Sequence, residues 1–502
     1  MLDHLDSIGT RAENHRPFPR FDLDREAWIA LVATLADKPD WSLVGLWADT
    51  GIVHMALRNE GPGTVAVVSL ACPEGRFPSV GGARPGAIRL ERTAQDLFGV
   101  TAESLVDPRP WLDHDSWPIR LPLSADPPDP LGHPEPYPFL PVEGPGLHQI
   151  PVGPVHAGII EPGHFRFTCN GETVVRLEQR LGYVHKGTEW LMGGRSVAEV
   201  AKLSARVSGD STVAHSYAFA RAVESATGAT VPARAVWLRA LMAELERLAN
   251  HLGDIGAICN DAAFAYMLAE CGLLREKVLR AADACFGHRL MMDRVIPGGV
   301  AVDLAEDGKQ VLTRLVADLR EAFPPLIHTY DEKASLQDRT VSTGRVVTEL
   351  VRRFGAGGHV GRASGRAHDA RRSPGYAPYG ELEFDVPVFI DGDVNARVWV
   401  RIREVEASLG LIAQILDRLP EGPVHAAVPA AAGQGMALVE SFRGEIMTWV
   451  ALREDGIVTR CHPRDPSWFQ WPLLEAAIEG NIVADFPLCN KSFNCSYSGH
   501  DL

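Results

Sequence analysis

The sequence predicts an α+β protein, in which an N-terminal α+β domain precedes a larger domain built on a helical bundle with a small β part. Strand-like apolar runs come first, and amphipathic helical patterns follow later. Between them, 12 prolines lie from Pro118 to Pro154, a density that neither a helix nor a central strand tolerates. We therefore expect domains at residues 1–120 and 153–502, joined by a proline-rich linker or strap at residues 121–152.

Two apolar runs in the N-terminal part are typical of strands. Residues 41–47 read WSLVGLW, and residues 64–70 read TVAVVSL. The second run is nearly continuous, so we expect that strand to be buried on both faces. Together the two runs predict a compact α+β domain.

Three helices are predicted in the second part. Ser196 and Glu199 form the capping box of the first, Pro232 opens the second, and the third ends before Pro420. Apolar residues recur at steps of three and four in the second and third, namely Leu238, Leu241, Leu245, Leu248, Leu252 and Ile255, then Ile402, Val405, Leu409, Ile412 and Leu416. This periodicity predicts helix-bundle packing. We expect Glu244 and Glu246 to be solvated or paired charges.

Residues 355–380 are rich in Gly and Arg and have too little apolar periodicity for a helix. Two interpretations stay open for this segment. It is either an ordered functional loop or a flexible part of the surface.

The charge balance excludes two classes of partner. Lys+Arg 49 against Asp+Glu 64 give a net charge of −15, which argues against nucleic acid and against general attraction to an anionic membrane surface. No apolar run approaches the roughly 18 residues of a membrane helix. The first 20 residues carry charges where a signal peptide would be apolar. We therefore expect a cytoplasmic protein.

The eight cysteines are spread along the chain without a C-x-x-C pair, so buried free thiols are expected. The alternative is a zinc site, whose spacing would match no standard pattern. Its ligands would be Cys461, His462, Cys489, Cys495 and His500. The chain also lacks cysteines spaced for an iron-sulfur cluster of its own and a G-x-G-x-x-G turn for a dinucleotide.

The most informative feature of the chain is a metal-ligand frame that has lost its cysteines. Residues 206–215 fit R-x-C-G-x-C-x-x-x-H with serine at both cysteine positions, and residues 496–502 fit a C-x-x-C terminus with serine and glycine there. The four positions are Ser208, Ser211, Ser496 and Gly499. Four thiolates would select soft nickel and iron, whereas hydroxyls are poor ligands for such metals and glycine has no side chain. We therefore expect this chain to bind no metal.

Several other segments accompany this frame in a consistent order. They are LGYVHKGTE at residues 181–189, RASG at 362–365, DAR at 369–371, VRIRE at 400–404 after Arg397, and DFPL with NKSFN between 485 and 494. Together they resemble the large subunit of membrane-bound group 4 [NiFe]-hydrogenases and its relative, the quinone-site subunit of respiratory complex I. Residues 91–100, ERTAQDLFGV, resemble the E-R-x-x-x-D-L-F-G signature of the smaller peripheral subunit of complex I. The resemblance implies both subunits fused in one chain, as in the large subunit of formate-hydrogenlyase-type complexes.

The resemblance also implies what stands in the place of the metal. In the hydrogenases the four frame positions hold nickel and iron, so hydrogen activation is not expected here. Complex I binds a quinone headgroup in the vacated cavity through a tyrosine and a histidine. Gly209 stands at the tyrosine position, and residues 159–164 lack the usual histidine motif. His156 or His164 would take its place, or both are structural histidines.

The candidate catalytic residues follow from the same resemblance. Glu189 matches the proton-transfer glutamate of hydrogenases, and Asp261 matches an acidic residue of the complex I coupling region. A semi-buried cavity would raise the pKa of either carboxyl towards neutrality and let it relay protons, although a surface ion pair or a helix cap would also explain them. Arg206 either neutralises a neighbouring carboxylate or cluster or is structural. His215 completes the frame.

Asp369 and Arg371 lie in the Gly-rich segment that in the family faces the partner subunits. We expect them at an interface or a cavity, where a quinone could also bind. The function expected for the whole chain is that of a metal-free subunit of a membrane-associated, complex-I-like oxidoreductase, which passes electrons to quinone and couples this to ion movement. It would bind no cofactor itself, a small subunit would carry a [4Fe-4S] cluster, and ion-translocating membrane subunits would hold it at the inner face of the cell membrane. The alternative is a non-catalytic structural subunit.

Overall fold

The computed structural model describes residues 1–114, 117–129, 136–156 and 160–502. The N-terminal part is a five-stranded sheet whose strands β3 and β6 run parallel and whose other neighbours run antiparallel. Its order is β1 (Thr10–Ala12), β3 (Arg20–Leu23), β6 (Thr64–Ala71), β5 (Ile52–Asn59) and β4 (Trp41–Asp49). Strands β4 and β6 confirm the two predicted strands, and all but the terminal residues of β6 are buried.

A second five-stranded sheet belongs to the larger part of the chain. Its order is β12 (Arg195–Ser196), β17 (Ile457–Arg464), β16 (Gly444–Leu452), β15 (Gly433–Ser441) and β2 (His15–Arg16). Strand β2 comes from the N-terminal part and pairs in parallel with β15. Apolar side chains of β4, β5 and β6 also pack against those of β15 and β16 in one core cluster. The two sheets are therefore joined by both hydrogen bonds and packing.

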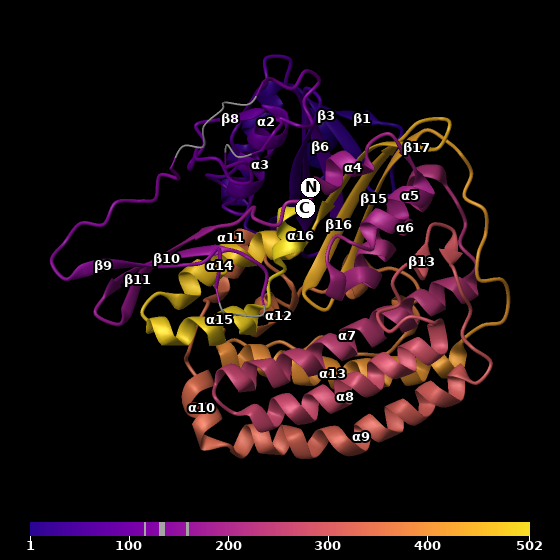
Figure 1. Ribbon diagram of the computed structural model, residues 1–502. Helices are drawn as coiled ribbons and strands as arrows, with labels where there is room; N and C mark the ends of the chain where they lie inside the picture. Colours follow the sequence, from indigo (N-terminus) through magenta and orange to yellow (C-terminus); the bar gives the residue numbers. More distant parts are fainter. Residues whose placement is uncertain (115–116, 130–135, 157–159) are drawn as a thin grey trace.

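A three-stranded sheet forms an arm that projects from the body in Figure 1. It consists of β11 (Thr173–Arg180), β10 (His164–Asn170) and β9 (Leu147–Val152), all antiparallel. Strand β9 lies inside the segment expected to be a linker or strap, so the end of that segment is part of a sheet.

Long helices form a layer beneath the second sheet in Figure 1. They are α7 (Ala233–Asp261), α8 (Ala265–Phe286), α9 (Gly308–Glu332) and α13 (Val394–Arg418). Helix α7 follows Pro232, α13 ends two residues before Pro420, and the leucine and isoleucine stripes of both are buried, as predicted. The predicted capping box of Ser196 and Glu199 opens α5 (Val197–Ser204).

The Gly-rich segment 355–380 is ordered and largely buried. It contains α12 (Gly358–Ala363) and two single turns at Arg371–Gly375 and Tyr379–Glu381. His359, Arg362 and Tyr379 are fully buried in it. Its interpretation as a flexible surface segment is therefore wrong, because buried guanidinium and phenol groups fix its path.

The remaining elements are short or connect these layers. They are α1 (Leu2–Ile8), α2 (Arg25–Asp37), β7 (Arg76–Pro78), α3 (Ala87–Phe98), β8 (Thr101–Glu103), α4 (Thr188–Met192), a 3₁₀ turn (Gly209–Ser211), α6 (Thr212–Thr227), β13 (Val295–Ile296), β14 (Gly299–Val300), α10 (Ala334–Thr340), α11 (Thr348–Phe354), α14 (Ser467–Ile478), a 3₁₀ turn (Val483–Asp485), α15 (Phe486–Phe493) and α16 (Tyr497–Asp501). All eight cysteines lie buried as free thiols, as expected.

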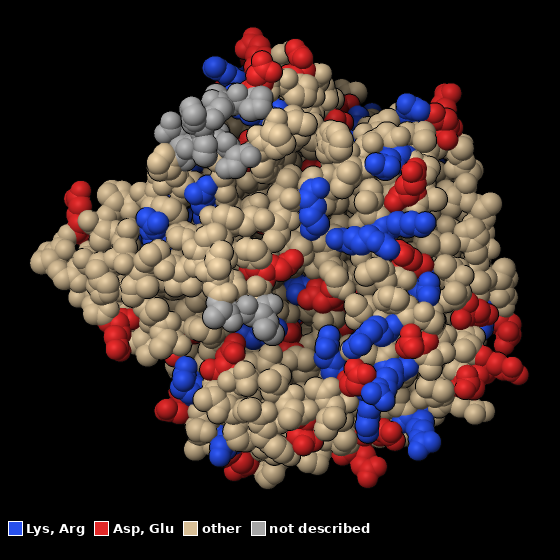
Figure 2. Space-filling model, viewed as in Figure 1, with Lys and Arg blue, Asp and Glu red and all other residues tan. Residues whose placement is uncertain are grey.

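Two surface properties bear on the expected partners. Within the described ranges, none of the helices has the length and apolarity needed to cross a membrane. On the face drawn in Figure 2, Lys and Arg are interspersed with Asp and Glu rather than gathered into one basic field. This face therefore does not present the single basic field that attracts nucleic acid.

Candidate functional site

The structure brings together the two segments that carry the cysteine-free frame. Ser208 Oγ lies 2.7 Å from Ser496 Oγ, and both side chains are buried. The Ser208 hydroxyl donates to Asp210 Oδ1 at 3.0 Å, so the Ser496 hydroxyl donates to Ser208. Ser496 Oγ in turn accepts the backbone N–H of Gly499 at 2.9 Å and caps α16. We call Ser208, Ser211, Ser496 and Gly499 the serine site.

A carboxylate occupies the space next to the fourth position of the serine site. A Cβ atom on Gly499 would lie 2.8 Å from the Asp465 carboxyl group and 2.9 Å from Ser496 Oγ. Asp465 Oδ2 lies 3.1 Å from His215 Nε2. Burial opposes ionisation of Asp465, but the hydrogen bond and charge of His215 and the charge of Arg443 together lower its pKa to about 2. Position 499 therefore has no room for a thiolate unless Asp465 moves.

Ser211 occupies the N-cap position of α6, but its side chain makes no cap hydrogen bond. Its buried Oγ has no partner in the described part of the chain. Glu246 on α7 caps α6 instead, because its carboxylate accepts the N–H groups of Val213 at 2.7 Å and Ala214 at 3.1 Å. Burial raises the pKa of Glu246 to about 8. The expectation that Glu246 is a solvated or ion-paired charge is therefore wrong, since backbone amides hold it.

Two cations cross-link the segments of the serine site. Lys186 Nζ donates to the carbonyl oxygens of Val207 at 3.3 Å and Ser498 at 3.1 Å. Arg443 donates to Asp210 at 2.7 Å and to the Asn494 carbonyl at 2.5 Å. Each cation thus joins one segment to the other, which is the structural role that a shared metal ion would have. Lys186 belongs to the LGYVHKGTE motif, whereas no sequence signal marks Arg443.

Arg206 makes its side-chain hydrogen bonds to residues outside the serine site. Its guanidinium pairs with Asp293, with Nη2 2.8 Å from Oδ2, and the pair is partly exposed. Both interpretations of Arg206 stay predictions, because a structural arginine also forms such a surface ion pair. His215, in contrast, is 1% exposed and reaches the site through Asp465.

Glu189 is buried against two basic side chains of β17. Its carboxylate lies 2.6 Å from His462 Nδ1 and 3.2 Å from Arg460. Although burial opposes ionisation, the charges of Arg460 and His462 and their hydrogen bonds lower the pKa of Glu189 to about 2. The expected rise of this pKa towards neutrality is therefore wrong. The sequence could not show this, because both partners lie more than 270 residues further along the chain.

Asp261 ends α7 and is half-buried. Burial raises its pKa, opposed by the charge of Lys491 and a hydrogen bond from Asn260. This direction agrees with the expectation for a carboxyl group that holds and releases protons. Asp261 and Glu189 thus differ in the sense of their pKa shifts.

The ion pair of Glu189 gives a first testable prediction. Because its folded-state pKa is depressed, Glu189 stabilises the fold fully above its unfolded pKa near 4.5 and loses that contribution as pH falls towards about 2. Glu189→Gln should therefore cost roughly 3 kcal/mol of unfolding free energy at pH 7, and the deficit should shrink below pH 4.5. Urea unfolding of both proteins at a series of pH values measures it. A deficit that is equal at pH 3 and pH 7 would contradict the ion pair.

The two histidines proposed for a quinone lie near the start of β10. His164 Nδ1 is 2.9 Å from the Gly153 carbonyl, and burial lowers its pKa. His156 Nε2 lies 3.3 Å from the Glu161 carbonyl. Glu161 accepts the backbone N–H of Ser498 at 3.1 Å, so this segment lies beside the C-terminal half of the serine site. His164 Nε2 is buried without a partner among the described residues.

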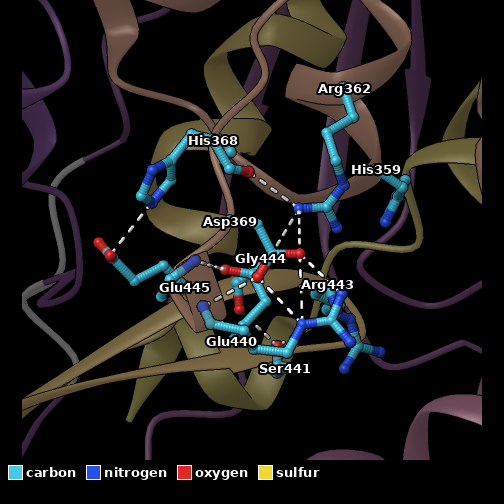
Figure 3. Close-up of polar contacts among 12 residues, drawn as sticks. His359, Arg362, His368, Asp369, Glu440, Ser441, Arg443, Gly444 and Glu445 are labelled. Carbon is cyan, nitrogen blue, oxygen red and sulfur yellow. Dashed lines mark hydrogen bonds and ion pairs between the residues drawn. The ribbon is translucent and has the colours of Figure 1, made fainter. Parts of the chain in front are cut away.

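Asp369 and Arg371 belong to a buried ionic network, drawn in part in Figure 3. Arg371 lies 2.7 Å from Asp369 and 3.0 Å from Glu244 of α7. Arg362 of α12 pairs with Glu404 of α13 at 2.7 Å and with Glu440 of β15 at 2.8 Å. The interface interpretation of Asp369 and Arg371 is wrong, because both are at most 2% exposed in this chain alone.

The network joins the bundle, the Gly-rich segment and the second sheet. The opposing charges of Arg371 and Arg362 lower the pKa of Asp369 against its burial. Burial and the charge of Asp369 raise the pKa of Glu440 to about 7. Glu440 and Arg443 were not predicted from the sequence, since strands β15 and β16 carry no motif that marks them.

The acidic residues of the N-terminal signature, residues 91–100, accept hydrogen bonds from the backbone of neighbouring loops. Glu91 accepts the N–H groups of Val80 at 2.5 Å and Gly81 at 3.2 Å. Asp96 accepts those of Trp111 at 2.6 Å and Leu112 at 2.8 Å. The signature therefore fixes the loops on both sides of α3, one of which reaches the serine site.

The donor set of the serine site does not suit a soft metal. Hydroxyl and carboxylate oxygens replace sulfur, and Asp210 and Asp465 already pair with Arg443 and His215. In the described part of the chain, no group of three or more His, Cys, Asp or Glu is arranged to hold a metal ion. The residues present therefore do not fit a nickel-iron centre.

Comparison with known protein families divides the chain into three matches. Residues 21–130 match the respiratory-chain NADH dehydrogenase 30 Kd subunit, residues 186–253 match nickel-dependent hydrogenase, and residues 254–432 match the respiratory-chain NADH dehydrogenase 49 Kd subunit. The 30 Kd match covers the N-terminal sheet from β3 onward with α2 and α3, and the other two matches together cover α4 to α13, which include the long helices of the bundle.

Individual proteins show the same likeness. Formate hydrogenlyase subunit 5 of Escherichia coli (strain K12) is 34% identical over 85% of this chain and 77% of its own length. The carbon monoxide-induced hydrogenase of Rhodospirillum rubrum is 33% identical over 69% of this chain and 97% of its own. A chain of the solved membrane-bound sulfane sulfur reductase, an archaeal respiratory membrane complex, superposes with a TM-score of 0.67 at 26% identity, covering 71% of this chain and 99% of that one.

Proposed function

Because the chain belongs to the family that fuses the 30 kDa and 49 kDa subunits of complex I and is related to the large subunits of group 4 [NiFe]-hydrogenases, we propose that it is a metal-free subunit at the end of an electron chain. It is a subunit of a complex-I-like, hydrogenase-related oxidoreductase. In the proposed arrangement, a partner subunit brings an iron-sulfur cluster to the serine site, and membrane subunits move ions.

One observation carries the metal-free part of the proposal, the contact of 2.7 Å between Ser208 and Ser496. In a nickel-iron site, these two positions would each place sulfur on the metal. Here the two hydroxyls contact each other, and the Asp465 carboxyl group lies 2.8 Å from where a Cβ on residue 499 would stand. Lys186 and Arg443 hold the segments together. The site has replaced its metal cross-link by hydrogen bonds.

Quinone is the leading acceptor in this proposal. Its support is the family relation to the quinone-site subunit and the contact of Ser498 with Glu161, which lies three residues before His164. Sulfane sulfur is a second acceptor class, favoured by the likeness of the fold to the membrane-bound sulfane sulfur reductase. Reduction assays of the purified complex with a short-chain quinone and with polysulfide, given the same electron donor, distinguish the two.

Metal analysis of the purified native complex tests the central claim. We expect iron and acid-labile sulfide in amounts that the partner's clusters explain, and nickel below 0.1 atom per complex, a limit set at roughly a tenth of stoichiometry. Stoichiometric nickel that stays with this chain would refute the proposal. As a positive control, an authentic group 4 hydrogenase purified in the same way must retain its nickel.

The coupling role is tested at Asp261. Asp261→Asn should lower acceptor reduction coupled to ion movement by at least about tenfold, while uncoupled reduction persists, because an amide cannot release a proton. The control is Asp283→Asn, which changes an exposed carboxylate on the neighbouring helix α8. If Asp261→Asn and Asp283→Asn behave alike, the chain has the alternative role of a non-catalytic structural subunit.

A further inference from the structure

A tryptophan of the N-terminal part reaches into the C-terminal segment of the serine site. Trp111 is 1% exposed, and its indole Nε1–H donates to His500 Nε2 at 3.2 Å. The two rings meet edge to face, and His500 stacks on Trp468 with ring centroids 4.0 Å apart. His500 belongs to α16, whose N-cap is Ser496. The N-terminal part thus contacts the short helix that carries half of the serine site.

The polar contacts of His500 fix its tautomer. An indole N–H can only donate, so His500 Nε2 must be the unprotonated nitrogen that accepts. Its Nδ1 therefore carries the hydrogen and donates to Asp501 Oδ1 at 2.8 Å. Both ring nitrogens are satisfied, and the ring is fully buried. Loss of the Trp111 donor would leave a buried acceptor without a partner, which costs more than the hydrogen bond itself.

Further contacts connect His500, through Asp501, to the motif that carries Lys186. Asp501 Oδ2 accepts the N–H of Val184 at 3.1 Å, and its carbonyl lies 2.6 Å from His185 Nδ1. The next residue, Lys186, bonds to Val207 and Ser498. A continuous series of contacts therefore connects the Trp111 ring to both segments of the serine site.

At the Trp111 end of this series of contacts, residues in and beside the N-terminal signature hold the tryptophan. Asp96 accepts the backbone N–H groups of Trp111 and Leu112, and Arg92 donates to the carbonyls of Arg109 and Pro110. The guanidinium groups of Arg89 and Arg92 lie 4.3 and 4.6 Å from the Trp111 ring centroid. The backbone of Trp111 is thus held by Asp96 of the signature, and its ring is in contact with two guanidinium groups.

We propose that Trp111 is a positioning residue. Through it, the fused N-terminal domain holds His500 in place and keeps the two segments of the serine site in contact. Its role does not depend on which acceptor the complex reduces, so the inference goes beyond the proposed function. It also gives a reason for joining the two parts in one chain, because the site is then always accompanied by the domain that completes it.

Hydrogen exchange measured by mass spectrometry on the full chain tests this inference. Trp111→Phe replaces the indole by a phenyl ring, which keeps an aromatic side chain and removes the donor. We expect exchange in residues 494–502 and 181–188 to accelerate about five- to tenfold, as the loss of one buried hydrogen bond implies. Trp28→Phe is the matched control, since Trp28 is fully buried in the same domain and donates to the Pro78 carbonyl. Unchanged exchange in Trp111→Phe, or equal acceleration in both variants, would overturn the inference.

Substitution of His500 provides a second, independent test. His500→Gln retains an acceptor for Trp111 and a donor for Asp501, whereas His500→Phe retains only the stacking on Trp468. We expect His500→Gln to keep the exchange of residues 494–502 within about twofold of the unsubstituted chain and His500→Phe to accelerate it as Trp111→Phe does. In the His500→Phe background, Trp111→Phe should then have no further effect. Additive effects of these two substitutions, or equal behaviour of Gln and Phe at position 500, would show that the contact does not position the site.

Discussion

Arg362→Met is expected to lower the free energy of unfolding by about 4 kcal/mol, the cost typical of removing one partner from a buried ion pair. The guanidinium of Arg362 is fully buried and lies 2.7 Å from Glu404, 2.8 Å from Glu440 and 3.6 Å from Asp369. Methionine fills a similar volume but leaves these three carboxylates without that cation. Denaturant unfolding at pH 7 measures the effect.

The pH dependence distinguishes this electrostatic cause from a loss of packing. Burial opposes ionisation of Glu404, but the charge of Arg362, together with the hydrogen bond and charge of His251, holds its pKa well below its usual range. Glu404 therefore stabilises the fold above its unfolded pKa and loses that contribution as pH falls. In the variant this pKa rises, and protonation in acid relieves the buried charge. The deficit of Arg362→Met should be largest near pH 7 and shrink towards pH 4, whereas a deficit independent of pH would contradict the ionic network.

Arg352 of α11 offers the matched control. It is an exposed arginine in the neighbouring helix. Arg352→Met should change the unfolding free energy by no more than about 0.5 kcal/mol, as is usual for surface substitutions. A comparable loss in both variants would show that any Arg→Met change destabilises this region.

Local chemistry made the main elements predictable from the sequence. The capping box of Ser196 and Glu199, the proline before α7 and the leucine stripe of that helix each act within a few residues of one another. The strands β4 and β6 likewise follow from continuous apolar runs. The pairing of β2 with β15 was not predictable in this way, because it joins residues more than 400 positions apart through two short backbone segments.

The candidate site was predictable in its composition but not in its electrostatics. Once the resemblance supplies the frame, the four positions without cysteine can be read in residues 206–215 and 496–502. The pKa of Glu189, in contrast, depends on Arg460 and His462, and that of Asp465 depends on His215. Such partners come together only in the folded chain, where β17 packs against α4 and where His215 of α6 contacts Asp465 just after β17. A carboxylate in a motif therefore indicates where chemistry could occur, while its charged neighbours decide whether it can exchange protons.

Gly358→Ala is expected to lower the unfolding free energy by on the order of 3 to 5 kcal/mol, the range of severe backbone strain combined with steric conflict. Gly358 opens α12 at a φ of +64°, and an added Cβ would lie 1.8 Å from the Arg443 carbonyl oxygen and 2.8 Å from Gly444 Cα. These are backbone atoms of the turn between β15 and β16. Gln470 fixes the same carbonyl through a hydrogen bond of 2.7 Å, so the turn has little freedom to move away.

The expected consequence of Gly358→Ala extends to the serine site. Displacement of the turn moves Arg443, whose side chain joins Asp210 to the Asn494 carbonyl. We therefore expect hydrogen exchange of residues 206–211 and 494–499 to increase together with the loss of stability. Gly380→Ala is the control from the same Gly-rich segment, because no other atom lies within 4 Å of a Cβ there. A melting temperature of Gly358→Ala within about 2 °C of the unsubstituted protein would show that the turn can yield, and that Gly358 does not hold Arg443 in place.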